Sequence, residues 1–265
     1  MGASEVKTTN RFAERLGRFV SRLSHKRALK DCDRQLVYQT RYAAYFRNGM
    51  IQEKEEELLF DKSYDEAENC WLTMSYVDDV FASTLRLHVA DRIGSVLPSM
   101  AVFGDVLEPY LRAGRVIVDP TRLAARVDAA VKHPELPYVA TRPAWMAFEH
   151  FRADLAIATV SKEHEGFYRR VFGYVPLTEP RDYPLLTFKV VCLGLDFKSA
   201  KADVESRYPF FRSTVAEREA LFGSGRAPPE LIGLAPSAQG GRPSIRSLAT
   251  LAAADHRAGL VSAEP

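Results

Sequence analysis

The chain has 265 residues, of which 46% are hydrophobic and 26% charged, and its formal net charge is +2. This composition is typical of a globular protein, and it excludes a disordered, collagen-like or membrane-embedded chain. No stretch approaches the roughly 18 apolar residues of a membrane-spanning helix, and no secretory signal is apparent, so we expect a cytoplasmic protein.

The N-terminal segment 1–30 is strongly basic, with eight Lys and Arg residues against two Glu. Within it, residues 9–28 place apolar side chains at intervals of three and four, which predicts an amphipathic helix. Three partners for its apolar stripe stay open: the domain's own core, a second copy in an oligomer, or a lipid surface contacted peripherally. Its basic residues either attract an acidic partner or form an ordinary solvated face.

The next part of the chain predicts a helix followed by a hairpin. Residues 36–47 are rich in aromatic side chains and predict a helix, and an acidic loop covers residues 52–69. The apolar runs 70–77 and 80–89 predict two strands, because β-branched and aromatic residues dominate them. Asp78 and Asp79 mark the turn between these strands.

The second half alternates between helices and strands. The predicted elements are a helix over 103–114 closed by Gly114, a buried strand in 115–125 ended by Pro120, a helix over 145–152, a strand over 155–161, a helix over 163–173 capped by Gly173, and a strand over 185–195. An antiparallel meander followed by alternating strands and helices predicts an α/β or α+β layered domain.

The chain divides by composition into three parts. We expect a basic helix in residues 1–30, a folded domain in residues 31–222 and a tail in residues 223–265. The tail is rich in Pro, Gly, Ser and Ala, which bury too little apolar area to offset the entropy of ordering, so we predict that it is disordered. The three cysteines have no paired spacing, and no histidine spacing indicates a metal site.

Four segments occur in the same order and at similar spacing as in the acyl-homoserine-lactone synthases and the N-acyl amino acid synthases. They are TRYAAYF with Arg41, FDKSYDEAENCWL with Asp61 and Asp65, STLRLH with Arg86, and VIVDPTRLAA with Asp119, Thr121 and Arg122. A fifth, HEGFYRRVFGYVPL, contains His164, Tyr168, Phe172 and Gly173 and resembles the amino-acid branch. The resemblance covers roughly residues 34 to 196.

The chain departs from the lactone synthases after the first motif. Their aromatic stretch, which helps to hold S-adenosylmethionine, is replaced here by RNGMIQEKEEELL. This difference favours the N-acyl amino acid synthases. The resemblance implies a GNAT-like acyltransferase fold with splayed strands in a mixed, mostly antiparallel sheet flanked by helices. It also implies transfer of a fatty acyl group to an amino acid or a related amine, as in bacterial signalling enzymes.

The donor implied by the resemblance is an acyl-phosphopantetheine thioester on an acyl carrier protein, with no separate cofactor. Coenzyme-A-dependent relatives bind pyrophosphate with a glycine-rich loop after the fourth motif, where backbone N–H groups meet the anion. The corresponding segment 122–145 contains no glycine. We therefore expect a carrier-protein donor and a small-molecule amine acceptor, and no nucleic-acid partner.

Six charged residues have two interpretations. Asp61, Asp65 and Asp119 could orient the acceptor's ammonium group while Arg41, Arg86 or Arg122 clamp a carboxylate. Alternatively, all six form a buried ion-pair network. A mixed answer assigns Arg86 and Asp119 to catalysis and leaves Asp65 and Arg122 open between the two roles.

The remaining candidates lie in the fourth and fifth motifs. Pro120 should end the pairing between the splayed strands, so an unpaired backbone N–H near Thr121 to Leu123 could face the thioester oxygen. His164 is a general base for the attacking amine, a structural residue that caps the helix starting there, or an anchor for the phosphopantetheine. Tyr168 and Phe172 lie one turn apart and should pack in the core, with Tyr168 able to reach the departing thiol.

Other functions remain open. The scaffold could have lost turnover and serve as a binding or assembly protein, and a filled core between the splayed strands would favour that function. A signal synthase like the lactone synthases, or an ordinary coenzyme-A-dependent acetyltransferase, is the other possibility.

Overall fold

The computed structural model describes residues 14–223 and 232–233. Residues 14–20 are helical, and the elements after them are β1 Leu23–Arg27, α2 Asp31–Arg47, α3 Lys62–Asp65, β2 Cys70–Val77, β3 Val80–Ala90, α4 Met100–Arg112, β4 Ile117–Ala125, α5 Val127–Lys132, α6 Leu136–Val139, α7 Arg142–His150, β5 Leu155–Ser161, α8 Lys162–Phe172, β6 Val175–Pro176, β7 Val190–Asp196, α9 Phe197–Arg207, the 3-10 helix η1 Pro209–Phe211, α10 Val215–Phe222 and β8 Ile232–Gly233. No helix among these residues is long and apolar enough to cross a membrane.

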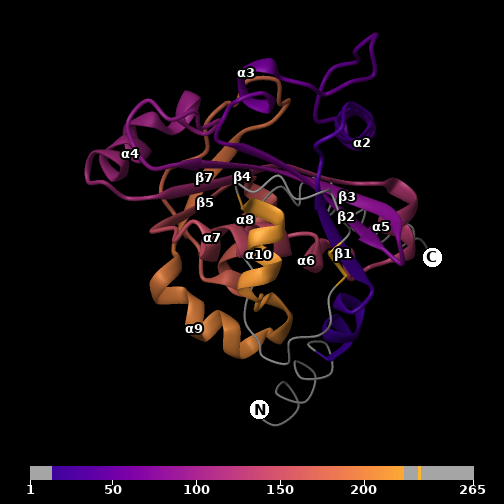
Figure 1. Ribbon diagram of the computed structural model, residues 1–265. Helices are drawn as coiled ribbons and strands as arrows, with labels where there is room; N and C mark the ends of the chain where they lie inside the picture. Colours follow the sequence, from indigo (N-terminus) through magenta and orange to yellow (C-terminus); the bar gives the residue numbers. More distant parts are fainter. Residues whose placement is uncertain (1–13, 224–231, 234–265) are drawn as a thin grey trace, which may run out of the picture.

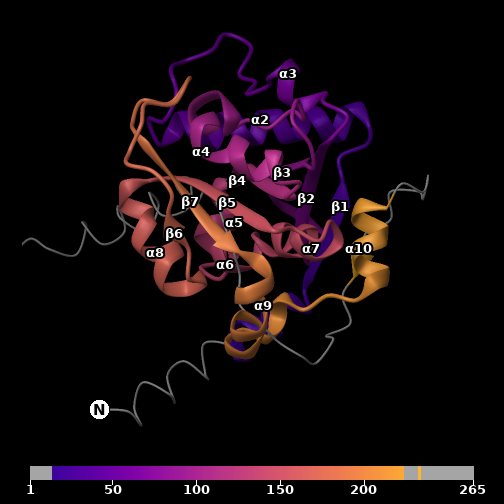
Figure 2. The same cartoon turned by 90° about the vertical axis from the view of Figure 1, so that its left-hand side faces the viewer.

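The described strands form one sheet in the order β6-β7-β5-β4-β3-β2-β1-β8 (Figure 1). Neighbouring strands are antiparallel except β4 and β5, which are parallel. Helices α2, α3 and α4 lie on one face of the sheet, and α6, α7, α8 and α9 lie on the other (Figure 2). The layered α/β prediction is therefore confirmed.

Several predicted elements occur as expected. The hairpin β2–β3 turns at Asp78 and Asp79, whose φ values of 49° and 62° are those of a two-residue hairpin turn. Strand β5 has the predicted bounds, and α8 ends at Gly173, whose φ of 76° is the left-handed conformation that glycine adopts without strain. The last long strand is shorter than predicted, because residues 185–189 belong to a loop.

The predicted helix over residues 9–28 is wrong at its C-terminal end. The helix stops at residue 20, and residues 23–27 form β1, which pairs with β2 along its whole length. The backbone groups along the edge of β2 form hydrogen bonds with residues 23–27, and these bonds outweigh the helix propensity of that segment. Leu16, Phe19 and Val20 are buried in the main core, so the apolar stripe packs on the domain itself. Residues 23–27, which the composition assigned to a separate N-terminal part, thus contribute a strand to the sheet of the domain.

The prediction that Pro120 ends its strand is also wrong. Strand β4 continues to Ala125 and stays paired with β3, with Pro120 opposite Leu87. Its pairing with β5 stops at Val118, so from there β4 resembles an edge strand on that side, where proline is tolerated.

The predicted disordered tail falls mostly on residues 224–231 and 234–265, which lie outside the described residues. Ile232–Gly233 is the exception, because it pairs with β1 as β8.

Candidate active site

The parallel strands β4 and β5 separate near the middle of the sheet. They pair only at Ile117–Leu155 and Val118–Ala156, although both continue for several more residues. A pocket opens beside them, lined by Tyr45, Met50, Arg86, Thr121, Arg122, Thr159, Val160, Ser161, Tyr183, Leu186, Phe188 and Val190. The expected splay is confirmed, and the space beside it is open rather than filled.

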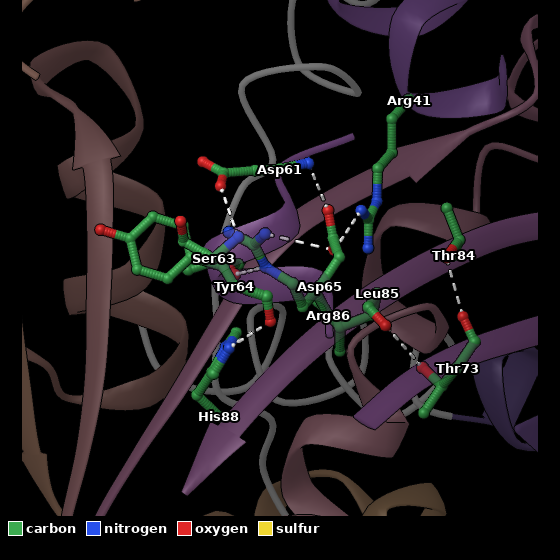
Figure 3. Close-up of polar contacts among 11 residues, drawn as sticks. Arg41, Asp61, Ser63, Tyr64, Asp65, Thr73, Thr84, Leu85, Arg86 and His88 are labelled. Atoms are coloured by element: carbon green, nitrogen blue, oxygen red, sulfur yellow. Dashed lines mark hydrogen bonds and ion pairs between the residues drawn. The ribbon is translucent and has the colours of Figure 1, made fainter. Parts of the chain in front are cut away.

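Arg41, Asp65 and Arg86 form a buried ion-pair network beside this pocket (Figure 3). Nη1 of Arg41 donates to Oδ1 of Asp65 at 2.8 Å, and Nη1 of Arg86 donates to the same oxygen at 3.2 Å. The side chains of all three are at most 2% exposed. The network joins α2, α3 and β3, so the first three family motifs meet at one carboxylate.

Asp61 contributes to the network through its backbone. Its N–H donates to Oδ2 of Asp65 at 2.8 Å, while its own carboxylate accepts from the N–H of Ser63 and caps α3. Burial alone would raise the pKa of Asp65, but the charges of Arg41 and Arg86 outweigh it and lower that pKa to about 2. Asp65 is therefore ionised throughout the physiological range, and both of its carboxylate oxygens accept hydrogen bonds from protein groups.

Arg86 connects the network to the pocket. Its Nε donates to Oγ1 of Thr121 at 2.9 Å, and both residues line the pocket. A β-bulge lies directly beyond, because the register between β3 and β4 shifts after Thr121 and Arg122 has a φ of 55°. The guanidinium of Arg122 lies 5.4 Å from the ring centre of Tyr45, and burial lowers its pKa. Arg86, Thr121 and Arg122 thus form one wall of the pocket.

Asp119 lies outside the pocket lining but is connected to it. It is fully buried and accepts from the backbone N–H of Ser99 at 3.0 Å. The hydroxyl of Ser99 is 3.1 Å from that of Thr159, which lines the pocket. Asp119 therefore lies one polar residue behind the pocket wall, close to the point where β4 and β5 separate.

Ser161 and His164 form a polar pair at the end of β5. Nδ1 of His164 is 2.6 Å from Oγ of Ser161, and Ser161 lines the pocket. Ser161 occupies the N-cap position of α8, yet its side chain accepts no backbone N–H there. Burial lowers the pKa of His164, so its imidazole is neutral near pH 7 and can accept a proton.

Tyr168 and Phe172 lie elsewhere. Both side chains are fully buried in the main core, where they pack against each other and against Tyr174. Neither lines the pocket. Their packing is as expected from their one-turn spacing, whereas a contact with substrate stays a prediction.

Sequence patterns did not indicate Tyr45, Ser99, Thr159, Ser161 or the loop residues before β7 as parts of the site. Ser161 had one usable signal, because it stands three residues before His164 at a strand-to-helix junction. The others come from four distant segments that meet only in the folded chain. Among the described residues, no group of three His, Cys, Asp or Glu side chains could hold a metal ion.

The family model of the N-acyl amino acid synthase FeeM matches residues 36–196, which is more than half of the chain. The chain belongs to the N-acyl amino acid synthase FeeM family. It is therefore an N-acyltransferase, and the function of a binding protein without turnover is not supported. The match covers all five motifs, from α2 to the end of β7. Comparison with curated protein sequences gave no match.

Three solved structures are similar to this chain to different degrees. The structure of FeeM, an N-acyl amino acid synthase from uncultured soil microbes, superposes with a TM-score of 0.56 at 13% identity, covering 67% of this chain and 92% of that one. The acyl-homoserine-lactone synthase LasI gives 0.49 at 10% identity, with 67% and 93% covered. The coenzyme-A-dependent lactone synthase MesI gives 0.44 at 13% identity, with 72% and 87% covered. The likeness to FeeM establishes the GNAT-like fold.

Proposed function

We propose that the protein transfers a fatty acyl group from the phosphopantetheine thioester of an acyl carrier protein to the amine of an amino acid or a related small molecule. The observation that carries this proposal is the pocket where β4 and β5 separate, with Arg86 and Thr121 on its wall. An extended phosphopantetheine arm fits beside a strand whose backbone has lost its neighbour.

The pocket combines apolar and polar walls in a way that suits this substrate. Met50, Leu186, Phe188 and Val190 provide apolar surface for the start of an acyl chain. The polar wall of Arg86, Thr121 and Arg122 faces the same space. A guanidinium beside the pocket can stabilise negative charge on the thioester oxygen or hold a carboxylate of the acceptor.

In the proposed reaction, the neutral amine attacks the thioester carbonyl. A C–N bond forms, the C–S bond breaks, the amine loses a proton and the departing sulfur receives one. His164 accepts the amine proton through the Ser161 hydroxyl, because that hydroxyl lies at the pocket and contacts Nδ1. Asp119 does not line the pocket. It accepts a hydrogen bond from the backbone N–H of Ser99 and so holds the Ser99 hydroxyl beside the pocket residue Thr159.

The carrier protein is proposed as the donor because the segment after Arg122 contains no glycine. The short helices α5 and α6 occupy this segment instead of a glycine-rich loop. A carrier protein presents a single phosphate on its arm and does not need a site for pyrophosphate. The three cysteines are free, which agrees with a reducing, cytoplasmic setting.

The test compares one acyl group on two donors. The purified full chain is incubated with an acyl carrier protein thioester or with the same acyl group on coenzyme A, together with each of the twenty amino acids, and products are identified by mass spectrometry. We expect an N-acyl amino acid and a much higher kcat/KM for the carrier-protein donor. Equal kcat/KM values would contradict the donor assignment, and products without an amide would contradict the reaction.

A further inference from the structure

A second open pocket lies between the end of β1, the start of α2 and the turn from α3 to β2. It is lined by Arg27, Ala28, Leu29, Arg34, Asp65, Glu66, Ala67, Cys70 and Leu72. It shares no lining residue with the pocket beside β4 and β5. No residue with a role in the proposed acyl transfer lines this pocket.

Two guanidinium groups line this pocket without a carboxylate partner. Within residues 14–223, neither Arg27 nor Arg34 forms an ion pair, and Arg34 contacts the hydroxyl of Tyr38. Both arginines are half-buried. Burial lowers the pKa of Arg27, and the charge of Arg34 lowers it further. Two cations held close together, partly away from water, are unfavourable unless an anion joins them.

The acidic residues of the lining do not neutralise this charge. Asp65 already accepts from Arg41 and Arg86 on Oδ1 and from a backbone N–H on Oδ2. Glu66 is exposed, and neither arginine bonds to it. Arg41, although fully buried, leaves Nε and Nη2 without a hydrogen-bond partner. The carboxylates of the lining therefore leave the positive charge of Arg27 and Arg34 uncompensated.

We propose that this pocket binds a small carboxylate ligand through Arg27 and Arg34. A guanidinium matches the geometry of a carboxylate and binds it with two parallel hydrogen bonds. The ligand is either the acceptor amino acid itself, held by its carboxylate, or a separate organic acid.

Calorimetric titration of the full-length protein tests the proposal with three ligands of matched size: 3-phenylpropionate, phenylalanine and phenethylamine. We expect the two carboxylates to bind and the amine not to bind. Arg27→Gln and Arg34→Gln should each weaken binding by about tenfold, since each removes a charge-assisted contact. Arg112→Gln is the matched control, because Arg112 is an exposed arginine on α4 that pairs with Glu108. It should leave the affinity unchanged.

Glu66→Gln supplies a change in the opposite direction. It removes a negative charge from the pocket and should tighten binding of 3-phenylpropionate. The proposal is overturned if no carboxylate binds, if phenethylamine binds equally well, or if the two arginine variants match Arg112→Gln. These binding results do not depend on acyl transfer. In the transfer assay, competition between 3-phenylpropionate and the amino acid identifies the acceptor as the ligand, and inhibition or activation without competition identifies a separate acid.

Discussion

Asp65→Asn removes one negative charge from between two buried guanidinium groups. Asp65 is 2.8 Å from Arg41 and 3.2 Å from Arg86, and all three side chains are almost fully shielded from water. Removing one partner of such a buried pair costs about 3 to 5 kcal/mol, because the remaining charges stay desolvated. We therefore expect the free energy of unfolding at pH 7 to fall by about this amount.

The pH dependence of stability gives a second measure of the same network. The pKa of Asp65 is lowered from 3.8 to about 2 in the folded state, which corresponds to about 2 kcal/mol of stability. Because the folded pKa is the lower one, the unfolded chain binds the proton more readily. This stability is therefore present above about pH 4 and is lost as the pH falls through 2. The Asp65→Asn variant should lack this component.

The assay is urea unfolding followed by circular dichroism, at pH 7 and at steps down to pH 2.5. Asp203→Asn is the control, because Asp203 pairs with Arg207 at 3.0 Å on the exposed surface of α9. Exposed pairs contribute little, so this variant should unfold nearly like the native protein. If Asp65→Asn and Asp203→Asn lose equal stability, the buried network does not hold α2, α3 and β3 together, and our reasoning about Asp65 is refuted.

Three further outcomes are expected. Arg86→Gln and Asp119→Asn should each reduce kcat for acyl transfer by at least about tenfold, because each loses a charge-assisted contact. Both variants should also have a lower melting temperature, since both residues are buried. His164→Gln should remove the acid limb of the pH–rate profile. In the native protein the inflection of this limb should lie below the usual histidine pKa of 6.5, because burial lowers the pKa of His164. An unchanged profile would exclude His164 as the base. Arg18 lies on the exposed face of the N-terminal helix, where its charge can attract an acidic carrier protein. Arg18→Glu should therefore raise KM for the carrier-protein donor at low salt and leave kcat nearly unchanged. An unaltered KM would show that the basic residues of this helix form only a solvated face.

Local sequence determined the elements whose signals are contained within a few residues. The turn at Asp78 and Asp79, the strand over 155–161 and the helix that ends at Gly173 all follow from apolar patterns flanked by turn or cap residues. The ordered motifs also predicted the family and the separation of the two parallel strands. Each of these features depends either on residues that are neighbours along the chain or on motifs that occur in the same order in the family.

Tertiary structure decided the features that depend on distant partners. Residues 23–27 became a strand because the edge of β2 was free to pair, and Pro120 stayed inside β4 because β5 had already separated from it. The sequence named Arg41, Asp61, Asp65 and Arg86 as charged candidates but did not show which would pair. Only the packing of α2, α3 and β3 made Asp65 the shared partner of two arginines, since the energy of an ion pair is set by distance and burial, and neither quantity is local to the sequence.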